Sequence, residues 1–298
     1  MQKPKVLAIV GPTASGKTSL SIKLAYEFNG EVISADSRQV YRGMDIGTGK
    51  ITTAEMGQVP HHILDVADPM DIYTGIDFKR DAGVALHNII QREHLPIIAG
   101  GTFFYLELLR GTMQAAPVAP NPAFRKTLEP YSNSELMDML REKDAHRADS
   151  IDPENRRRLE RSLEIIHTLG EVPEVRVTES EYDWLLLGID IPKETLHKNI
   201  NIRLETRLEQ GMIEEVQHLL DSGVTPKRLD DFGLEYRYIL KYLQQEVSYP
   251  EMCEQIETKS RQFAKRQLTW LKRYPEIEWV DPTNLEEICA RTKTFLAQ

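Results

Sequence analysis

The chain has 298 residues, of which 41% are hydrophobic and 28% are charged, and its formal net charge at pH 7 is −9. This length and composition are typical of one large or two modest globular domains with a substantial core. The apolar runs are far shorter than the roughly 20 residues that span a bilayer. The two cysteines, Cys253 and Cys289, lie far apart and argue against a disulfide framework or a zinc site, so we expect a cytoplasmic protein with no membrane contact.

The first hundred residues alternate between short apolar runs and glycine turns. Val6–Val10 predicts a buried strand, and the spacing of apolar residues in 19–28 predicts a helix. Two further strands are predicted at 31–35 and 95–99, the second of them followed by Gly100-Gly101-Thr102 and another helix. Strand, glycine turn, helix and strand in this order indicate an α/β fold with a parallel sheet.

The middle of the chain has a different texture. Prolines interrupt it from residue 117 onwards, and polar, charge-rich segments with helical spacing follow as far as Gly170 and Pro173. We therefore predict a helical insertion domain at 116–182 within a core formed by 1–115 and 183–298. In the second part of the core we expect strands at 184–189 and 277–280, the latter at an edge, and mainly helices from 202 to 274. The predicted fold is a P-loop-type parallel sheet flanked by helices, with a helical insertion.

A phosphate-binding loop is the strongest signal in the sequence. The segment Gly11-Pro12-Thr13-Ala14-Ser15-Gly16-Lys17-Thr18 matches G-x-x-x-x-G-K-[ST] in full and lies between a predicted strand and a predicted helix. Its glycines let successive N–H groups point inward, the helix start adds positive potential, and Lys17 adds a full charge. The hydroxyl of Thr18 stands where it can hold Mg²⁺ against the phosphates. The motif predicts binding of a diphosphate or a triphosphate and does not distinguish them.

A carboxylate and a second glycine turn are expected at the same edge of the sheet. Asp36 follows directly on the second strand, and the carboxyl ends of the strands are where α/β folds bind ligands. Gly100-Gly101-Thr102 offers a backbone nest and a hydroxyl, although two glycines after a strand also make ordinary turns. The strand ending in Asp that an ordinary P-loop ATPase or kinase needs has no convincing match, since only 32–36 and 63–65 come near it.

Positive charge gathers in two places despite the negative total. On a helical wheel, residues 259–273 separate into an apolar half and a basic half that contains no acid. A second cluster at 156–161 is diluted by glutamates. A charged stripe is most often only a solvated face, but one that lacks acidic residues favours contact with a phosphate backbone, because binding follows the local potential and not the net charge.

A set of motifs, in order from residue 6 to about 281, resembles the tRNA dimethylallyltransferase family. The motifs are the phosphate loop, Ala35-Asp36-Ser37, Val40–Thr48, Val59-Pro60-His61-His62, Tyr73, Asp77-Phe78, Ala99–Thr102 and Lys265–Leu271. Enzymes of this family are P-loop-type α/β proteins with a helical insertion. With Mg²⁺ they transfer a dimethylallyl group from its diphosphate to the exocyclic amine of the adenosine just 3′ of the anticodon. The resemblance therefore implies Mg²⁺ as cofactor, with dimethylallyl diphosphate and the anticodon stem-loop of tRNA as partners; we also expect a monomer.

The resemblance implies roles for individual residues. Gly11 to Thr18 would hold the donor diphosphate, with Lys17 acting on the leaving group. Asp36 would be the general base, and Thr102 would lie at the reacting centre. The residues that match tRNA-contacting stretches are Asp36, Ser37, Arg38, Gln39, Arg125, Arg157, Arg158, Arg161, Arg237, Lys265, Arg266, Gln267 and Lys272.

One segment departs from the family pattern. Where the family carries Gly-Tyr-Arg or Gly-Tyr-Lys, this chain reads Phe232-Gly-Leu-Glu-Tyr-Arg237. Either Glu235 replaces the glycine or two residues are inserted, which leaves the role of Arg237 open. The pair His61-His62 is also a family feature, to which the residues alone assign no chemistry.

Three other functions remain open on the sequence alone. An adenylate isopentenyltransferase would perform the same chemistry on a free nucleotide, for which neither the basic helix nor the insertion is needed. A P-loop kinase would transfer a phosphoryl group from ATP to a small molecule. A non-catalytic RNA-binding protein would use the loop as a nucleotide-controlled switch.

Overall fold

A parallel sheet of six strands forms the centre of the computed structural model, which describes residues 2–173 and 179–298. The strands are β1 (Lys5–Val10), β2 (Gly30–Ser34), β3 (His61–His62), β4 (Leu95–Gly100), β5 (Asp183–Ile189) and β6 (Ile277–Val280). Their order in the sheet is β3-β2-β4-β1-β5-β6, and every neighbouring pair is parallel. The predicted α/β fold with a parallel sheet is confirmed, and β6 lies at an edge as expected. The short strand β3, at the other edge, was not predicted.

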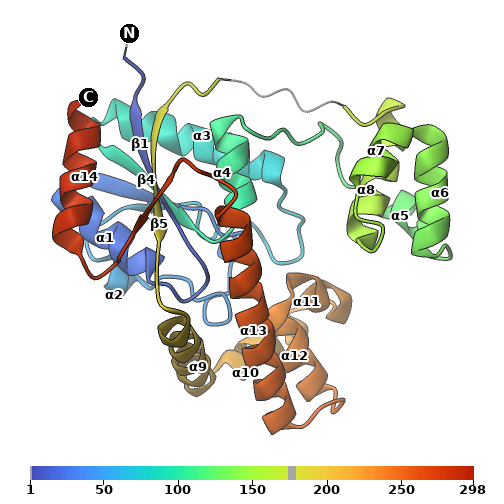
Figure 1. Cartoon of the computed structure of the whole chain (residues 1–298). Helices are drawn as coiled ribbons and strands as arrows, with labels where there is room; N and C mark the ends of the chain where they lie inside the picture. Colours follow the sequence, from blue (N-terminus) through green and yellow to red (C-terminus); the bar gives the residue numbers. More distant parts are fainter. Residues whose placement is uncertain (1, 174–178) are drawn as a thin grey trace. The chain divides into compact units, whose positions relative to one another are not determined.

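Helices connect the strands and cover both faces of the sheet (Figure 1). The helices of both units are α1 (Lys17–Glu27), α2 (Thr53–Met56), α3 (Gly75–Gln91), α4 (Phe103–Arg110), α5 (Pro122–Leu128), α6 (Asn133–Lys143), α7 (Ala145–Ser150), α8 (Arg156–Leu169), α9 (Lys193–Glu209), α10 (Met212–Asp221), α11 (Pro226–Phe232), α12 (Leu234–Leu243), α13 (Tyr249–Leu271) and α14 (Leu285–Ala297), of which α5 to α8 do not belong to the unit that contains the sheet. The helical run predicted from residue 202 thus begins earlier, at Lys193. No described helix has the length and apolar character needed to cross a membrane.

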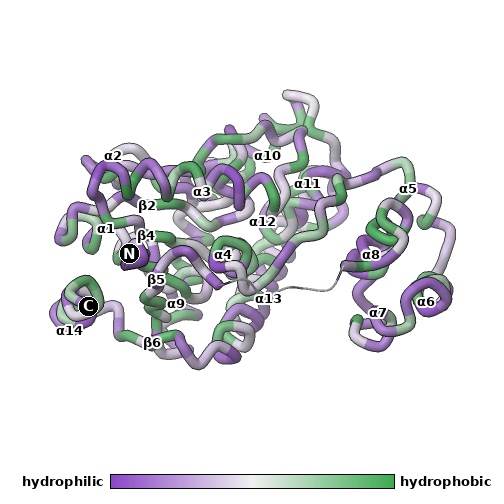
Figure 2. The backbone as a smooth tube through the Cα atoms, turned by 90° about the horizontal axis from the view of Figure 1, so that it is seen from above, coloured by the Kyte–Doolittle hydropathy of each residue, from purple (hydrophilic) through white to green (hydrophobic). Residues whose placement is uncertain are grey.

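The central strand β1 explains how the core is divided. Its alternate side chains point to opposite faces of the sheet. Val6, Ala8 and Val10 belong to a large core with α3 and α4, whereas Leu7 and Ile9 pack with α1 and α14 in a second core. In Figure 2 the helices carry apolar and polar segments in alternation, as expected of elements with one buried and one exposed face.

The chain divides into two compact units. One consists of Met1–Arg110 with Glu179–Gln298, and the other of Gly111–Thr178. The second unit contains α5 to α8, which enclose a small core of their own that includes Leu136, Leu140, Leu159 and Leu163. The sequence prediction placed the insertion domain at 116–182, and the second unit spans Gly111–Thr178. In the first unit, α9 to α13 lie beyond the carboxyl ends of the strands, the edge at which the phosphate loop also lies (Figure 1).

Candidate functional site

The phosphate loop joins the end of β1 at Val10 to the start of α1 at Lys17. Ala14 and Gly16 have positive φ angles of 62° and 91°, so the backbone curls back on itself as this motif requires. The ammonium of Lys17 folds over the loop and donates to the carbonyl of Pro12 at 2.7 Å. The loop therefore has a curled backbone at the beginning of a helix, where unpaired N–H groups and the helix dipole favour negative charge.

The strand register brings Asp36 and Thr102 to the same edge of the sheet. Ser34 pairs with Ala99 and Val10 pairs with Gly100, so the segments that follow these strands leave the sheet side by side. The hydroxyl of Thr102 accepts a hydrogen bond from the Ser37 amide at 3.0 Å, and the Thr102 amide donates to the carbonyl of Ala35 at 3.0 Å. A Cβ at Gly100 would lie 2.1 Å from that same carbonyl, so the close approach of the two segments requires glycine.

Gln267 joins the second glycine turn to the phosphate loop. Its side chain comes from α13, accepts from the Thr13 amide at 2.8 Å and donates to the carbonyl of Gly101 at 3.0 Å. The side-chain amide of Gln267 thereby links the phosphate loop to the Gly101 turn. Since both ends of this side chain are used inside the site, an additional contact of Gln267 with tRNA stays a prediction.

Helix α9 supplies two residues that the sequence reasoning missed. Arg203 donates to the hydroxyl of Thr13 at 2.6 Å, and Asn199 donates to the carbonyl of Ala14 at 3.2 Å. Both therefore contact the phosphate loop directly. The available signal was weak: α9 begins soon after the carboxyl end of β5, the edge of the sheet at which a ligand is expected.

Lys17 and Arg203 make the site electropositive, and both side chains are partly buried. Burial lowers the pKa of Lys17 to about 8, with Asp36 opposing the change and Arg203 adding to it. Burial also lowers the pKa of Arg203 to about 10, with the nearby charge of Arg207 acting in the same direction. Cations that destabilise one another in a buried place are stabilised when an anion binds between them. The electrostatics therefore favour a multiply charged anion such as a diphosphate.

The residues after Asp36 are held by contacts within the same unit. The Asp36 carboxylate accepts from the Arg38 amide at 2.9 Å. The Arg38 guanidinium donates to the carbonyl of Asp231 at 3.2 Å, and burial lowers its pKa. The side-chain oxygen Oε1 of Gln39 accepts a hydrogen bond from the hydroxyl of Ser34 at 3.0 Å. The segment that was predicted to contact tRNA thus begins at the carboxyl end of β2, beside the phosphate loop, while its tRNA contacts stay a prediction.

The outer side of α13 carries the predicted basic stripe. Lys265 and Arg266 are exposed, one to two residues before the inward-facing Gln267. The helix ends at Leu271, so Lys272 is its C-cap and lies at the end of the stripe, not within it. Arg261, another member of the stripe, forms an ion pair with Glu257 one turn earlier. A short basic surface at 265–266 therefore adjoins the residue that bridges the phosphate loop and the Gly101 turn.

The arginines predicted to bind tRNA in the insertion fall into two groups. Arg157 and Arg158 are exposed on α8. Arg125 and Arg161 instead bind the carboxylate of Glu164, which is fully buried, at distances of 2.5 to 2.9 Å. The latter two therefore stabilise the insertion itself, and their contact with tRNA stays a prediction.

Arg237 and Glu235, in the segment that departs from the family pattern, both have partners. Arg237 donates to the Asp230 carboxylate at 2.5 Å and to the Asp230 carbonyl at 2.9 Å. Glu235 lies 3.5 Å from Arg207, close to the cations of the phosphate site. Glu235 thus contacts the site through Arg207.

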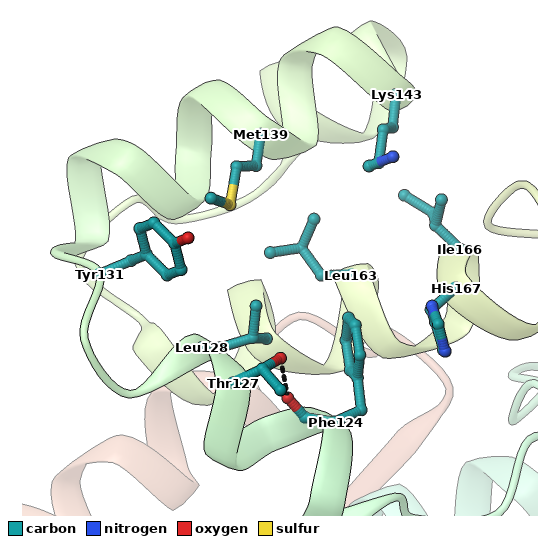
Figure 3. A pocket seen from close by; sticks show the side chains of 9 residues that line it. All are labelled: Phe124, Thr127, Leu128, Tyr131, Met139, Lys143, Leu163, Ile166 and His167. Carbon is teal, nitrogen blue, oxygen red and sulfur yellow. Dashed lines mark hydrogen bonds between the residues drawn. The ribbon is translucent and has the colours of Figure 1, made fainter.

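An apolar pocket lies in the insertion and contains none of the predicted catalytic residues (Figure 3). It is lined by Phe124, Thr127, Leu128, Tyr131, Met139, Lys143, Leu163, Ile166 and His167. Several of these side chains also form the small core of the insertion, and the Phe124 ring stacks on His167 at a centroid distance of 4.3 Å. The pocket is therefore the open side of that core.

The oxygen donors near the phosphate loop fit Mg²⁺ better than a softer metal. Thr18 is exposed at the first turn of α1, and Asp36 is the neighbouring carboxylate that affects the pKa of Lys17. Within the described residues, no three His, Cys, Asp or Glu side chains are grouped to hold a metal ion. This donor set suits an ion that keeps several waters and is held largely by substrate phosphates, as Mg²⁺ is.

Comparisons with known proteins agree with this geometry. The IPP transferase family model matches residues 39–274. The chain is 42% identical over 292 residues to a tRNA dimethylallyltransferase of Thermomicrobium roseum, covering 95% of this chain and 87% of that protein. It is 40% identical to tRNA dimethylallyltransferase 1 of Trichlorobacter lovleyi, covering 99% of this chain and 100% of that protein.

Solved structures show the same similarity. The tRNA isopentenylpyrophosphate transferase of Bacillus halodurans is 35% identical, with a TM-score of 0.75 and coverage of 99% of this chain and 97% of that one. A eukaryotic dimethylallyltransferase acting on tRNA is 29% identical, with a TM-score of 0.80 and coverage of 95% and 75%. The likeness extends over both the sheet and the segments that surround the site.

Proposed function

Because the chain belongs to the IPP transferase family, we propose that its phosphate loop holds the diphosphate of dimethylallyl diphosphate while the allyl group passes to tRNA. Membership of this family makes the chain a prenyltransferase that modifies tRNA. The acceptor is the exocyclic amine of the adenosine that follows the anticodon. The observation that carries the proposal is the meeting of the phosphate loop, Asp36 and Thr102, joined by the contacts of Gln267 and Ser37.

Negative charge grows on the diphosphate as the bond to the allylic carbon breaks. The loop amides, Lys17 and Arg203 stabilise this charge most when it is most developed, and this difference between ground state and transition state lowers the barrier. Their fixed contacts with Pro12 and Thr13 mean that little reorganisation is needed during the reaction. We assign Mg²⁺ to Thr18, where the bound ion would neutralise part of the charge on the diphosphate.

The adenine amine is a weak nucleophile because its lone pair is delocalised into the ring. Its proton becomes acidic as the new C–N bond forms, and we assign Asp36 as the base that accepts it, a role worth about 10²–10⁴-fold in rate. The Arg38 amide holds one oxygen of Asp36, which leaves the other available for the substrate. A stacked adenine cannot present its amine, so the base has to be unstacked from the loop into the site.

The exposed cations next to this site have a simple role in the proposal. Lys265 and Arg266 would contact the phosphates of the anticodon stem-loop, and Arg157 and Arg158 of the insertion would contact tRNA elsewhere. Lys17, Asp36, Thr102 and Arg203 all come from one chain, so we propose that a monomer is sufficient for the reaction.

Incubation of the purified protein with labelled dimethylallyl diphosphate, Mg²⁺ and unmodified anticodon stem-loop RNA tests the proposal. The expected product is RNA labelled at the adenosine 3′ of the anticodon, identified by nucleoside digestion. AMP in place of the RNA tests for an adenylate isopentenyltransferase, and ATP labelled in its terminal phosphate tests for a kinase. Unreacted RNA together with transfer or release of the terminal phosphate of ATP would contradict the proposal.

A further inference from the structure

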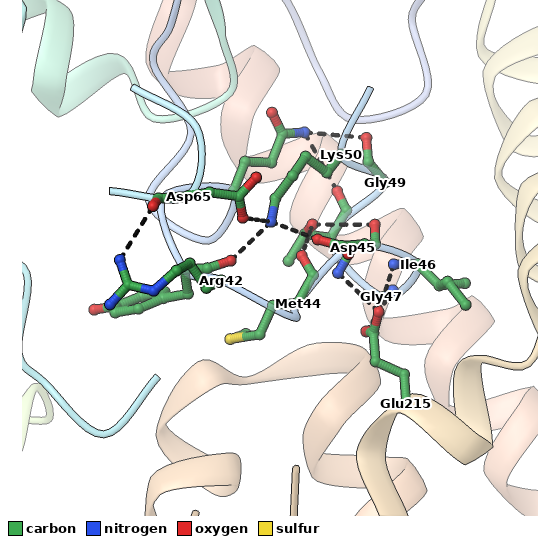
Figure 4. A network of polar contacts seen from close by, with 12 residues as sticks. Arg42, Met44, Asp45, Ile46, Gly47, Gly49, Lys50, Asp65 and Glu215 are labelled. Carbon is green, nitrogen blue, oxygen red and sulfur yellow. Dashed lines mark hydrogen bonds and ion pairs between the residues drawn. The ribbon is translucent and has the colours of Figure 1, made fainter. Parts of the chain in front are cut away.

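The loop between Met44 and Lys50, in the long segment after Asp36, is folded into a compact turn (Figure 4). The Thr48 hydroxyl donates to the carbonyl of Met44 at 2.6 Å. The buried ammonium of Lys50 donates to the carboxylates of Asp45 and Asp65, each at 2.5 Å, and to the carbonyl of Tyr41 at 2.7 Å. These contacts fix the shape of the loop, but all of their partners lie in the segment 41–65 itself.

Glu215, on α10, attaches three successive amides of this loop to the helices beyond the sheet. Its carboxylate accepts from three successive backbone amides, those of Asp45 at 2.7 Å, Ile46 at 2.6 Å and Gly47 at 3.0 Å. The hydroxyl of Tyr236 on α12 donates to the same carboxylate at 2.7 Å. Successive N–H groups that converge in this way form an anion-binding concavity, and hydrogen bonds to a charged acceptor are about twice as strong as neutral ones.

Two glycines permit the close approach of the helices to the loop. A Cβ at Gly47 would lie 2.7 Å from the ring of Tyr236, and a Cβ at Gly49 would lie 1.7 Å from the guanidinium of Arg207. Arg207 also donates to the carbonyl of Gly47 at 3.1 Å. The Gly47-Thr48-Gly49 turn is therefore enclosed by α9, α10 and α12, and Glu215 accepts from the amide of its first residue, Gly47.

Gln39 connects the enclosed turn to the catalytic edge. Its side-chain Nε2 donates to the carbonyl of Gly49 at 3.1 Å, and its side-chain Oε1 accepts from the hydroxyl of Ser34, the last residue of β2, at 3.0 Å. Asp36 lies between Ser34 and Gln39 in the chain. A displacement of the 45–49 turn would therefore move the Gln39 side chain, and with it the segment that contains Asp36.

We propose that Glu215 is a positioning residue for the prenyl transfer, acting through Gln39 on the segment of Asp36 that receives the RNA. This inference rests on the proposed function and adds to it a residue that touches neither substrate. Among the described residues, the hydrogen bonds of Glu215 reach the 45–47 amides and Tyr236 and not the phosphate loop, so its loss should impair the acceptor side of the reaction and spare the donor side.

The substitution Glu215→Gln keeps the size of the side chain but replaces one acceptor oxygen with an NH₂ group that faces N–H groups. We expect kcat with anticodon stem-loop RNA to fall about tenfold, with the KM for dimethylallyl diphosphate within twofold of wild type. Active sites are counted by donor binding, so that misfolded protein does not lower kcat. Glu214→Gln, on the exposed neighbour in the same helix, is the matched control and should behave as wild type.

A double-mutant cycle with Gln39→Ala distinguishes positioning from general destabilisation. If Glu215 acts through Gln39, Glu215→Gln should cause less than a twofold further loss of kcat in the Gln39→Ala background. Losses that multiply in the double variant, or an unchanged kcat in Glu215→Gln, would overturn the proposal. Tyr236→Phe removes one donor to the same carboxylate and provides a milder variant if Glu215→Gln does not fold.

Amide hydrogen exchange gives a readout that does not depend on catalysis. In Glu215→Gln the amides of 45–47 should lose protection while those of β1 and β4 keep it, and uniform loss over both would indicate a general structural role and overturn the proposal. Wild-type protein that leaves tRNA unmodified would overturn the proposed function, and this inference with it. Wild-type activity together with unchanged kinetics and exchange in Glu215→Gln would overturn this inference alone.

Discussion

The Lys17 ammonium is buried, which disfavours its positive charge, and a bound anion would stabilise that charge. Its pKa is lowered from 10.5 to about 8 by burial, so in the free protein the ammonium loses its proton as the pH rises through about 8. The binding of dimethylallyl diphosphate should therefore weaken between pH 7 and 9, since the charge is present below the pKa and lost above it. Calorimetric titration at several pH values measures this dependence.

The variant Lys17→Met provides the control for that measurement. It should bind the donor weakly at every pH, without the dependence centred near pH 8, because no titrating ammonium remains. At pH 7 its melting temperature should not fall, since the substitution removes a desolvated charge from the folded state. A pH dependence retained in Lys17→Met would assign the titration to another group.

Substitution of Asp36 should affect the rate of prenyl transfer and not the binding of tRNA. The Asp36 carboxylate accepts one backbone hydrogen bond, from Arg38, and the Ser37 amide beside it is held by Thr102. Asp36→Ala is expected to leave the Kd for tRNA within about threefold while lowering kcat by about 10²–10⁴-fold, the usual contribution of a general base. Binding is measured by filter retention and turnover by label incorporation. Full turnover in Asp36→Ala would remove this residue from the mechanism.

At the scale of the element, α13 performs two tasks on two faces. Gln267 points inward and bridges the phosphate loop and the Gly101 turn, whereas Lys265 and Arg266 are exposed. The double variant Lys265→Ala with Arg266→Ala should weaken tRNA binding and reduce its dependence on salt, because each phosphate contact contributes roughly one unit to the slope of log K against log salt. Donor affinity should not change.

A control for that double variant has to remove the same charge elsewhere. Lys23 on α1 and Lys79 on α3 are both exposed, so Lys23→Ala with Lys79→Ala changes the net charge equally. If both double variants lose the same affinity and the same salt dependence, the effect belongs to the total charge of the protein and α13 has no special role.

The sequence predicted elements wherever the signal was local. The apolar runs gave β1, β2, β4, β5 and β6 to within one residue, because buried parallel strands are continuous hydrophobic segments. The two-residue strand β3 escaped since His61-His62 has no apolar run and pairs only with β2. Its role is structural: His62 contacts the buried carboxylate of Glu31 at 2.6 Å.

The site could be predicted in part because several of its residues lie in local sequence motifs. The phosphate loop, Asp36 and Thr102 each follow a recognisable strand, and the parallel register brings them together. Arg203, Asn199 and Glu215 were missed because their role depends on how α9 and α10 pack beyond the sheet, and neither helix carries a motif. Tertiary contacts over more than 150 residues leave no local pattern to read.

At the scale of the whole molecule, each of the two units contains a buried carboxylate that is bound by arginine. Glu31 binds Arg92 through two hydrogen bonds at 2.8 and 2.9 Å and contacts His62 and His94, and these bonds outweigh the effect of burial and lower its pKa to about 2. In the insertion, burial is likewise outweighed by Arg125, the Asn121 amide and Arg161, which lower the pKa of Glu164 to about 2. Both carboxylates therefore stabilise their units as anions.

Acid should weaken the two units independently, each through its own carboxylate. A carboxyl group whose pKa falls from 4.5 to about 2 on folding contributes its full stability above pH 4.5 and loses it progressively as the pH falls toward 2.

Glu164→Gln should therefore destabilise the insertion at pH 7 by about 2 kcal/mol and make its unfolding less sensitive to acid, while Glu31→Gln should do the same to the sheet-containing unit. Pulse proteolysis with mapped cleavage sites reports on each unit separately. Since each unit has its own core, cleavage within 111–173 should appear first in Glu164→Gln. A single transition shifted equally by both substitutions would mean that the two units unfold as one.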